Sequence, residues 1–118
     1  MHTQIEKILS DLKNEWMWKM DYEVKSINEN EVEFETSVHS TPFDKIDPAP
    51  DGIARFSTIK CKVVKIDNDE YLLNGEYINK IDPENSLKHS IENLSLKPEI
   101  SKFNFKTKNL KKAINNLY

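Results

Sequence analysis

In two stretches of this sequence, residues suited to a protein core alternate with polar residues, and this alternation constrains the fold more than any other feature. Successive side chains of a β-strand point to opposite faces of a sheet, so the pattern predicts a strand with one buried face. In the first stretch the inward positions are Trp18, Met20, Tyr22 and Val24. In the second they are Val32, Phe34, Thr36 and Val38. Residues 28–30 between them are typical of a turn, which predicts an antiparallel hairpin.

Residues 3–16 are expected to form an amphipathic helix, because apolar residues recur there at helical spacing. The apolar stripe consists of Ile5, Ile8, Leu9, Leu12 and Trp16. Thr3 and Glu6 have the spacing of a capping box at its start. Trp18 would point away from this stripe if the helix continued. We therefore expect the helix to end within residues 14–16 and a strand to run from residue 18 to residue 27, with the aromatic cluster mainly in the core.

Two further strands are predicted in the middle of the chain. Residues 53–66 are strand-like, with a change of phase after Val63 that indicates a bulge or burial on both faces. Residues 70–81 are predicted to run back along the preceding strand after a turn. Asn74 and Gly75 within them form either a tight hairpin turn or a bulge in one longer strand, and the short flanking pieces favour the bulge.

The last third of the sequence predicts a helix, a strand and a second helix. Asp82, Pro83 and Glu84 are typical of a helix start, and Pro98 ends the segment. The stripe of this helix is Leu87, Ile91 and Leu94. Residues 99–106 alternate, with Phe103 and Phe105 on one face. Thr107 is the expected cap of a terminal helix, whose apolar face is Leu110, Ala113, Ile114 and Leu117.

These elements define an α+β fold in the order α-β-β-β-β-α-β-α, as one domain over residues 1–118. We expect an antiparallel sheet of about five strands with helices packed on one face, while the order of strands in the sheet stays open. The element order loosely resembles that of small bacterial secretion chaperones, a likeness at the level of fold alone.

Composition bounds the classes of function. No stretch approaches the roughly 20 apolar residues of a membrane span, and the N-terminus lacks the apolar run of a signal peptide. A single cysteine, Cys61, favours a cytoplasmic location. Six lysines against Glu99 make residues 97–118 basic, although the whole chain has a net charge of −3. Arg55 is the only arginine, which argues against sequence-specific nucleic-acid binding.

No pattern in the sequence predicts catalysis, a metal site or a cofactor. Cys61 is expected to be a buried hydrophobe, with its neighbouring lysines on the other face of the strand. The three histidines are scattered, at His2, His39 and His89. Two glycines, Gly52 and Gly75, are too few for a phosphate-binding loop.

Two candidate partner-binding segments stand out instead. Glu31, Glu33 and Glu35 form an acidic strand face, which either keeps the protein soluble and discourages stray strand pairing or meets a basic partner. Residues 39–52 form a long loop with three prolines, and long loops are often functional. Its candidate contact residues are Phe43, Asp44, Asp47 and Asp51.

The function expected from these features is stoichiometric association with another protein, as in an immunity protein, an antitoxin or a phage-type inhibitor. Its partner would be a toxin or a host-defence effector. One alternative is a secretion or folding chaperone that binds secreted clients and forms a homodimer. A second alternative is a small-ligand-binding domain with an apolar pocket. The rings that would line such a pocket are Trp18, Tyr22, Phe34, Phe103 and Phe105.

Overall fold

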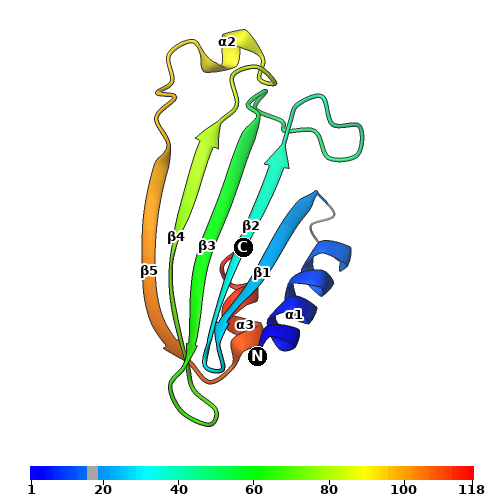
Figure 1. Cartoon of the computed structure of the whole chain (residues 1–118). Helices are drawn as coiled ribbons and strands as arrows, with labels where there is room; N and C mark the ends of the chain where they lie inside the picture. The colour runs from blue at the N-terminus through cyan, green and yellow to red at the C-terminus, as the bar shows by residue number, and fades with distance from the viewer. Residues whose placement is uncertain (16–18) are drawn as a thin grey trace.

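The computed structural model describes residues 1–15 and 19–118 as five strands and three helices (Figure 1). The elements are α1 (His2–Glu15), β1 (Met20–Asn28), β2 (Glu31–Ser40), β3 (Arg55–Lys65), β4 (Tyr71–Ile81), α2 (Lys88–Ile91), β5 (Glu99–Thr107) and α3 (Leu110–Asn115). The predicted α+β class and element order are confirmed. None of the described helices is long and apolar enough to cross a membrane.

The strands form one antiparallel sheet in the order β1-β2-β3-β4-β5. Each strand therefore lies beside its neighbour in the sequence, and β1 and β5 are the edges. Pairing is regular except for a bulge between Ser26 and Asn28 of β1. The change of phase predicted after Val63 is not a bulge, because the pairing of β3 continues unbroken to Lys65. Val64 instead lies half-buried on the face opposite Val63.

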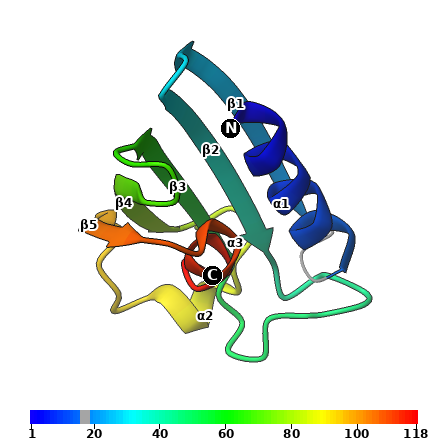
Figure 2. The same cartoon turned by 90° about the horizontal axis from the view of Figure 1, so that it is seen from below.

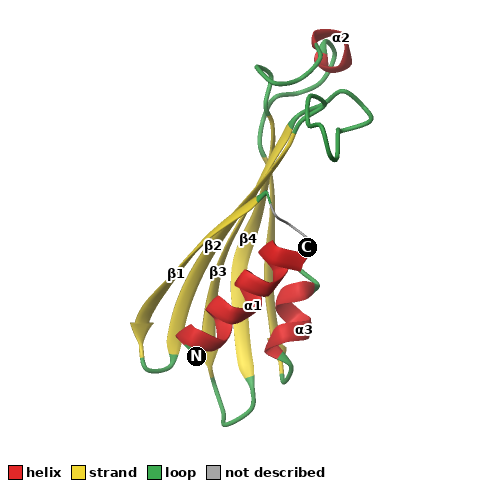
Figure 3. Ribbon diagram, turned by 90° about the vertical axis from the view of Figure 1, so that its right-hand side faces the viewer, coloured by secondary structure: helices red, strands yellow, loops and turns green. Residues whose placement is uncertain are grey.

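Two helices cover one face of this sheet. Figures 2 and 3 show α1 and α3 on the same side, over the half of the sheet that contains the short turns. The other side carries no described helix, and we call it the open face. The β2–β3 loop (residues 41–54) and α2 lie beyond the far end of the strands (Figure 1). These connections are held together by a backbone hydrogen bond from Leu87 N to Gly52 O (2.8 Å) and by a bond from Ala54 N to the side-chain Oγ of Ser86 (2.7 Å).

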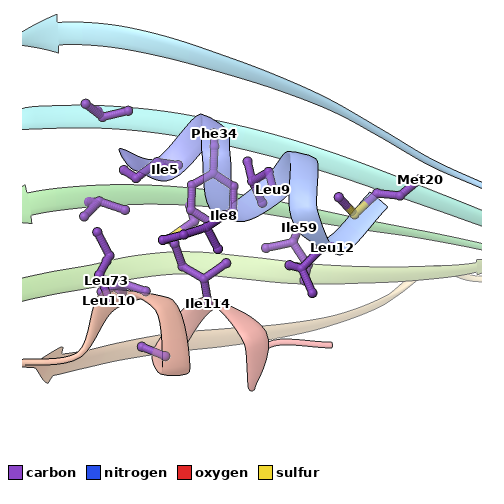
Figure 4. Packing of buried hydrophobic residues seen from close by; sticks show 14 residues of the cluster. Ile5, Ile8, Leu9, Leu12, Met20, Phe34, Ile59, Leu73, Leu110 and Ile114 are labelled. Atoms are coloured by element: carbon purple, nitrogen blue, oxygen red, sulfur yellow. The ribbon is translucent and has the colours of Figure 1, made fainter. Parts of the chain in front are cut away.

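The hydrophobic core lies between the helices and the covered face (Figure 4). As predicted, α1 buries Ile5, Ile8, Leu9 and Leu12. Trp16, the last residue of the predicted stripe, lies outside the described residues. From α3 come Leu110, Ala113 and Ile114. The sheet contributes the inward set of each inner strand, including Phe34, Ile59 and Leu73. Each large apolar side chain fully buried in this way contributes about 1.5–3 kcal/mol to folding.

The predicted helix at residues 82–97 shrinks to the four residues of α2. Asp82 belongs to a turn, in which its carboxylate accepts hydrogen bonds from Glu84 N (3.2 Å) and Asn85 Nδ2 (2.7 Å). Leu87 and Ile91 are only half-buried and Leu94 is exposed, because this segment lies beyond the sheet and its apolar stripe has no large surface to pack against. Short helices without tertiary packing are marginal in water.

Three other local predictions were wrong. β4 is the one longer strand that the sequence favours, but it passes through Asn74 and Gly75 without the predicted bulge. Helix α1 begins at His2, so Thr3 lies inside the helix instead of capping it. The cap of α3 is Asn109, whose side chain accepts from Lys112 N (3.1 Å).

Candidate functional site

The open face carries rows of charged residues that run across all five strands. One row follows the cross-strand register through Glu23, Glu35, Lys60, Glu76 and Lys102. The next row is Lys25, Glu33, Lys62, Asn74 and Asn104. The sequence places these side chains here because they occupy the positions that alternate with the core residues of each strand.

These rows surround a hollow of about 560 Å³ in the middle of the open face. It is lined by Glu23, Lys25, Glu33, Phe34, Glu35, Lys60, Cys61, Lys62, Asn74, Gly75, Glu76 and Lys102. Four glutamates and four lysines dominate this lining, so the hollow combines both signs of charge. Pockets for small molecules are of similar volume but are lined mainly by apolar side chains.

Gly75 is one of the residues that line this hollow. A Cβ atom on Gly75 would lie 2.1 Å from the carbonyl oxygen of Lys60 and 2.8 Å from Cζ of Phe103. Only a residue without a side chain fits between these two groups. The sequence reveals the glycine but not this reason for it, since Lys60 and Phe103 become neighbours only through the pairing of β3, β4 and β5.

The predicted acidic strand face is part of the open face, but in the folded sheet lysines lie beside it. Glu31, Glu33 and Glu35 lie on β2, an inner strand, with the lysines of β3 directly beside them. They therefore cannot protect a sheet edge. Lys62 Nζ lies 3.0 Å from Glu31 Oε1, and this hydrogen bond raises the pKa of Lys62.

An apolar patch adjoins the charged rows toward the far end of the open face. It consists of Phe56, Ile78 and Ile100, which lie on β3, β4 and β5 at adjacent or diagonal register positions. Ile100 is 58% exposed and Phe56 is 37% exposed. Exposed apolar groups next to charge are frequent in protein-binding surfaces. Sequence reasoning missed this patch. It placed Lys60 and Lys62 on the face opposite Cys61 but did not include them in a candidate site, although the alternation in both segments contained the signal.

His39 joins the patch to the β4–β5 connection. Its ring packs edge-on against Phe56, with 5.8 Å between centroids, and its Nε2 lies 3.1 Å from Asp82 Oδ2. Hydrogen bonds from Asn85 and from His39 lower the pKa of Asp82. This arrangement anchors the connection to the end of β2.

The loop residues predicted to bind a partner lie on a different part of the molecule. Phe43 and Ile46 are 63% and 76% exposed. Asp44 pairs with Lys19, and hydrogen bonding to that ammonium lowers the pKa of Asp44. Asp51 lies 2.6 Å from Arg55, which likewise lowers the pKa of Asp51.

Asp47 completes the loop set, and its backbone carbonyl accepts from Lys19 Nζ (3.3 Å). The loop follows the end of β2 opposite to Glu31. The structure thus separates the acidic strand face from the loop instead of joining them into one site.

The aromatic residues proposed as pocket lining take part in the core. Phe34 is buried, and Tyr22, Phe103 and Phe105 pack half-buried against the core cluster. Of these, Phe34 alone borders the charged hollow. Trp18 lies outside the described residues.

Cys61 and the basic end of the chain offer little for a reactive site. Burial raises the pKa of the Cys61 thiol to about 12, so the thiolate that would be reactive is disfavoured. Within residues 1–15 and 19–118, no group of three or more His, Cys, Asp or Glu side chains is placed to hold a metal ion. The lysines of residues 97–118 do not form one patch, because Lys102 and Lys106 belong to the open face while Lys111 and Lys112 lie on α3.

No protein-family model, curated protein or solved structure matches this chain. The likeness in element order to secretion chaperones therefore gains no support from these comparisons.

Proposed function

We propose that this protein is a binding module that acts by stoichiometric association with another folded protein, and that the open face is its contact surface. One observation carries the proposal: an entire face of the sheet has no described helix over it and combines charged rows with the apolar patch Phe56, Ile78 and Ile100, of which Phe56 and Ile100 are exposed. Apolar anchors supply binding energy, while surrounding charges supply specificity and speed of association.

The proposed role is that of an immunity protein, an antitoxin or a phage-type inhibitor that occupies a toxin or a host-defence effector. Such inhibitors act by shape and charge, and need no reactive group of their own. The size of the face suits this role. Four strand spacings of about 4.8 Å and strands of about 30 Å give roughly 600 Å² before side chains are counted. This approaches the ~800 Å² per partner of a standard interface.

A tagged capture from the native lysate, followed by mass spectrometry, tests this proposal. Two exposed isoleucines offer a matched pair of variants: Ile100→Asp alters the open face, and Ile46→Asp alters the loop. We expect one folded partner at fixed stoichiometry, lost with Ile100→Asp and kept with Ile46→Asp. The opposite result would assign binding to the loop, and the absence of any stoichiometric partner would contradict the proposal.

A second candidate function, a dimeric chaperone for secreted or unfolded clients, is favoured by the edge strand β5. No other described strand pairs with its outer edge, and such edges accept extended segments as an added strand. Lys102 and Lys106 on β5 weaken this candidate, because charged residues discourage pairing at sheet edges. Capture of many substoichiometric clients, unaffected by Ile100→Asp, would favour the chaperone.

A further inference from the structure

The charges of the open face divide sharply between its two halves. On β1 and β2 the carboxylates are Asp21, Glu23, Glu31, Glu33 and Glu35, and the ammonium group is Lys25. On β3, β4 and β5 the ammonium groups are Lys60, Lys62, Lys80, Lys102 and Lys106, and the carboxylate is Glu76. Five charges against one on each side make the β1–β2 half acidic and the β3–β5 half basic to the same degree.

This division is a property of the folded sheet and is not visible in the net charge. Strands β1 and β5 are about 19 Å apart, as four spacings of ~4.8 Å. The Debye length at physiological ionic strength is about 8 Å. A protein that approaches the surface therefore meets two separate fields of opposite sign, instead of an average of zero.

The charges that have no opposite charge facing them are the ones available to a partner. At the boundary, Glu35 faces Lys60 and Glu33 faces Lys62 across the ladder, which lowers the field there. Glu23 on β1 faces another carboxylate, Glu35. Lys106 on β5 faces Leu72, and Lys80 on β4 faces Phe56, so these two ammonium groups also lack a carboxylate opposite them. By contrast, Lys102 faces Glu76, and Asp21 pairs with Lys13 of α1 at 3.7 Å.

We infer that the partner segment carries a cationic block beside an anionic block, and that it lies across the strands with the cationic block over β1–β2 and the anionic block over β3–β5. This inference rests on the proposed function and specifies its partner. The hollow between the halves admits a convex segment, and the patch Phe56, Ile78 and Ile100 adjoins it as an apolar anchor. The charge division then fixes the direction in which the segment lies.

A second copy of this chain fits the face less well than a different protein. A two-fold axis along β3 would place β1 and β2 of one copy over β5 and β4 of the other. The acidic outer strands of each copy would then meet the basic outer strands of its partner. The same axis would bring Lys60 and Lys62 against their own equivalents and seal the charged hollow from water. Buried charges without good partners are costly, and charged residues are depleted from interface cores.

Two peptides of identical composition test the inference on the full-length protein. The block peptide is acetyl-Lys-Lys-Lys-Gly-Glu-Glu-Glu-amide, and the mixed peptide is acetyl-Lys-Glu-Lys-Gly-Glu-Lys-Glu-amide. Seven extended residues reach about 23 Å, which spans the sheet. Binding is followed by amide NMR shifts at about 10 mM ionic strength, where the Debye length is ~30 Å. We expect the block peptide to bind about fivefold tighter, with shifts on all five strands of the open face.

A quadruple charge exchange supplies the decisive control. The variant Glu33→Lys/Glu35→Lys/Lys60→Glu/Lys62→Glu keeps the composition and keeps opposite charges at the paired positions 33/62 and 35/60, although it removes the ion pair between Glu31 and Lys62. It leaves three charges of each sign on each half, so the preference for the block peptide should disappear. Equal binding of the two peptides to the wild type, or a preference that survives the exchange, would overturn the inference. A single folded partner captured without any block preference would leave the proposed function standing while this inference fails.

Discussion

The hydroxyl of Tyr118 lies 2.5 Å from Oγ1 of Thr36, which is 82 positions earlier in the chain. Thr36 sits on the covered face of β2 and is 1% exposed, among the core residues. The last residue of the sequence thus satisfies a buried polar group in the middle of the sheet. This bond ties the end of the chain beyond α3 to β2 and completes the cover that the two helices provide.

Removal of this hydroxyl should destabilise the fold. In Tyr118→Phe, the hydroxyl of Thr36 loses its partner in a buried position, and we expect a loss of about 1–2 kcal/mol in the free energy of unfolding. Urea denaturation measures this change. The double variant Thr36→Val/Tyr118→Phe should recover part of the loss, because no buried polar group then lacks a partner. Strictly additive effects of the two substitutions would contradict a direct bond.

Ionisation of Tyr118 should reduce the stability of the fold at alkaline pH. Burial raises the pKa of Tyr118 from 10.0 to about 12, so the folded protein holds this proton more tightly than the unfolded chain. The stabilisation is fully present below pH 10 and is lost as the pH rises from 10 to about 12. Spectrophotometric titration should show one tyrosine that ionises near pH 12. Tyr118→Phe should lack this transition and show a shallower fall in stability over that range, and an unchanged titration would contradict the assignment.

Alternation in the sequence is sufficient to predict most of the fold, because each strand has one face that must be buried. The inward sets of β1, β2 and β5 follow directly from this period, and the stripe of α1 follows from helical spacing. The same reasoning fails at residues 82–97. Asp82 and Pro83 are typical of a helix start, but Asp82 here binds Asn85 and His39 in a turn. Local helix signals cannot compensate for the lack of a surface to pack against.

For a related reason, sequence reasoning identified only the acidic half of the candidate site. Glu33 and Glu35 stand out as a run of acidic residues, whereas Lys60 and Lys62 appear as separate charges about 25 positions later. The division of the open face depends on which strands are neighbours, and this order comes from the topology alone. A partner-binding surface made of side chains from five strands therefore has no signature in a short segment of sequence.

Gly75 should not tolerate even a methyl group. In Gly75→Ala, the new Cβ would lie within 2.1 Å of the Lys60 carbonyl oxygen, a backbone atom that cannot move without distorting β3. We expect a loss of about 1–3 kcal/mol, as for other overpacked sites, measured by thermal or urea unfolding. The matched control is Asn74→Ala, an exposed neighbour on the same strand, which should change stability by less than about 0.5 kcal/mol. Equal effects of the two variants would show that the close approach is absent in solution.

The ion pair between Asp44 and Lys19 should govern how often the β2–β3 loop opens. Asp44→Asn removes the charge while its side-chain oxygen can still accept from Ile46 N, so the turn itself is kept. We expect trypsin to cleave after Lys45, which is exposed, about twofold to fivefold faster in this variant. Asp47→Asn is the control, because Lys19 contacts the backbone carbonyl of Asp47 and this group is unchanged. The wild-type rate in Asp44→Asn, or equal acceleration in both variants, would show that the ion pair does not hold the loop.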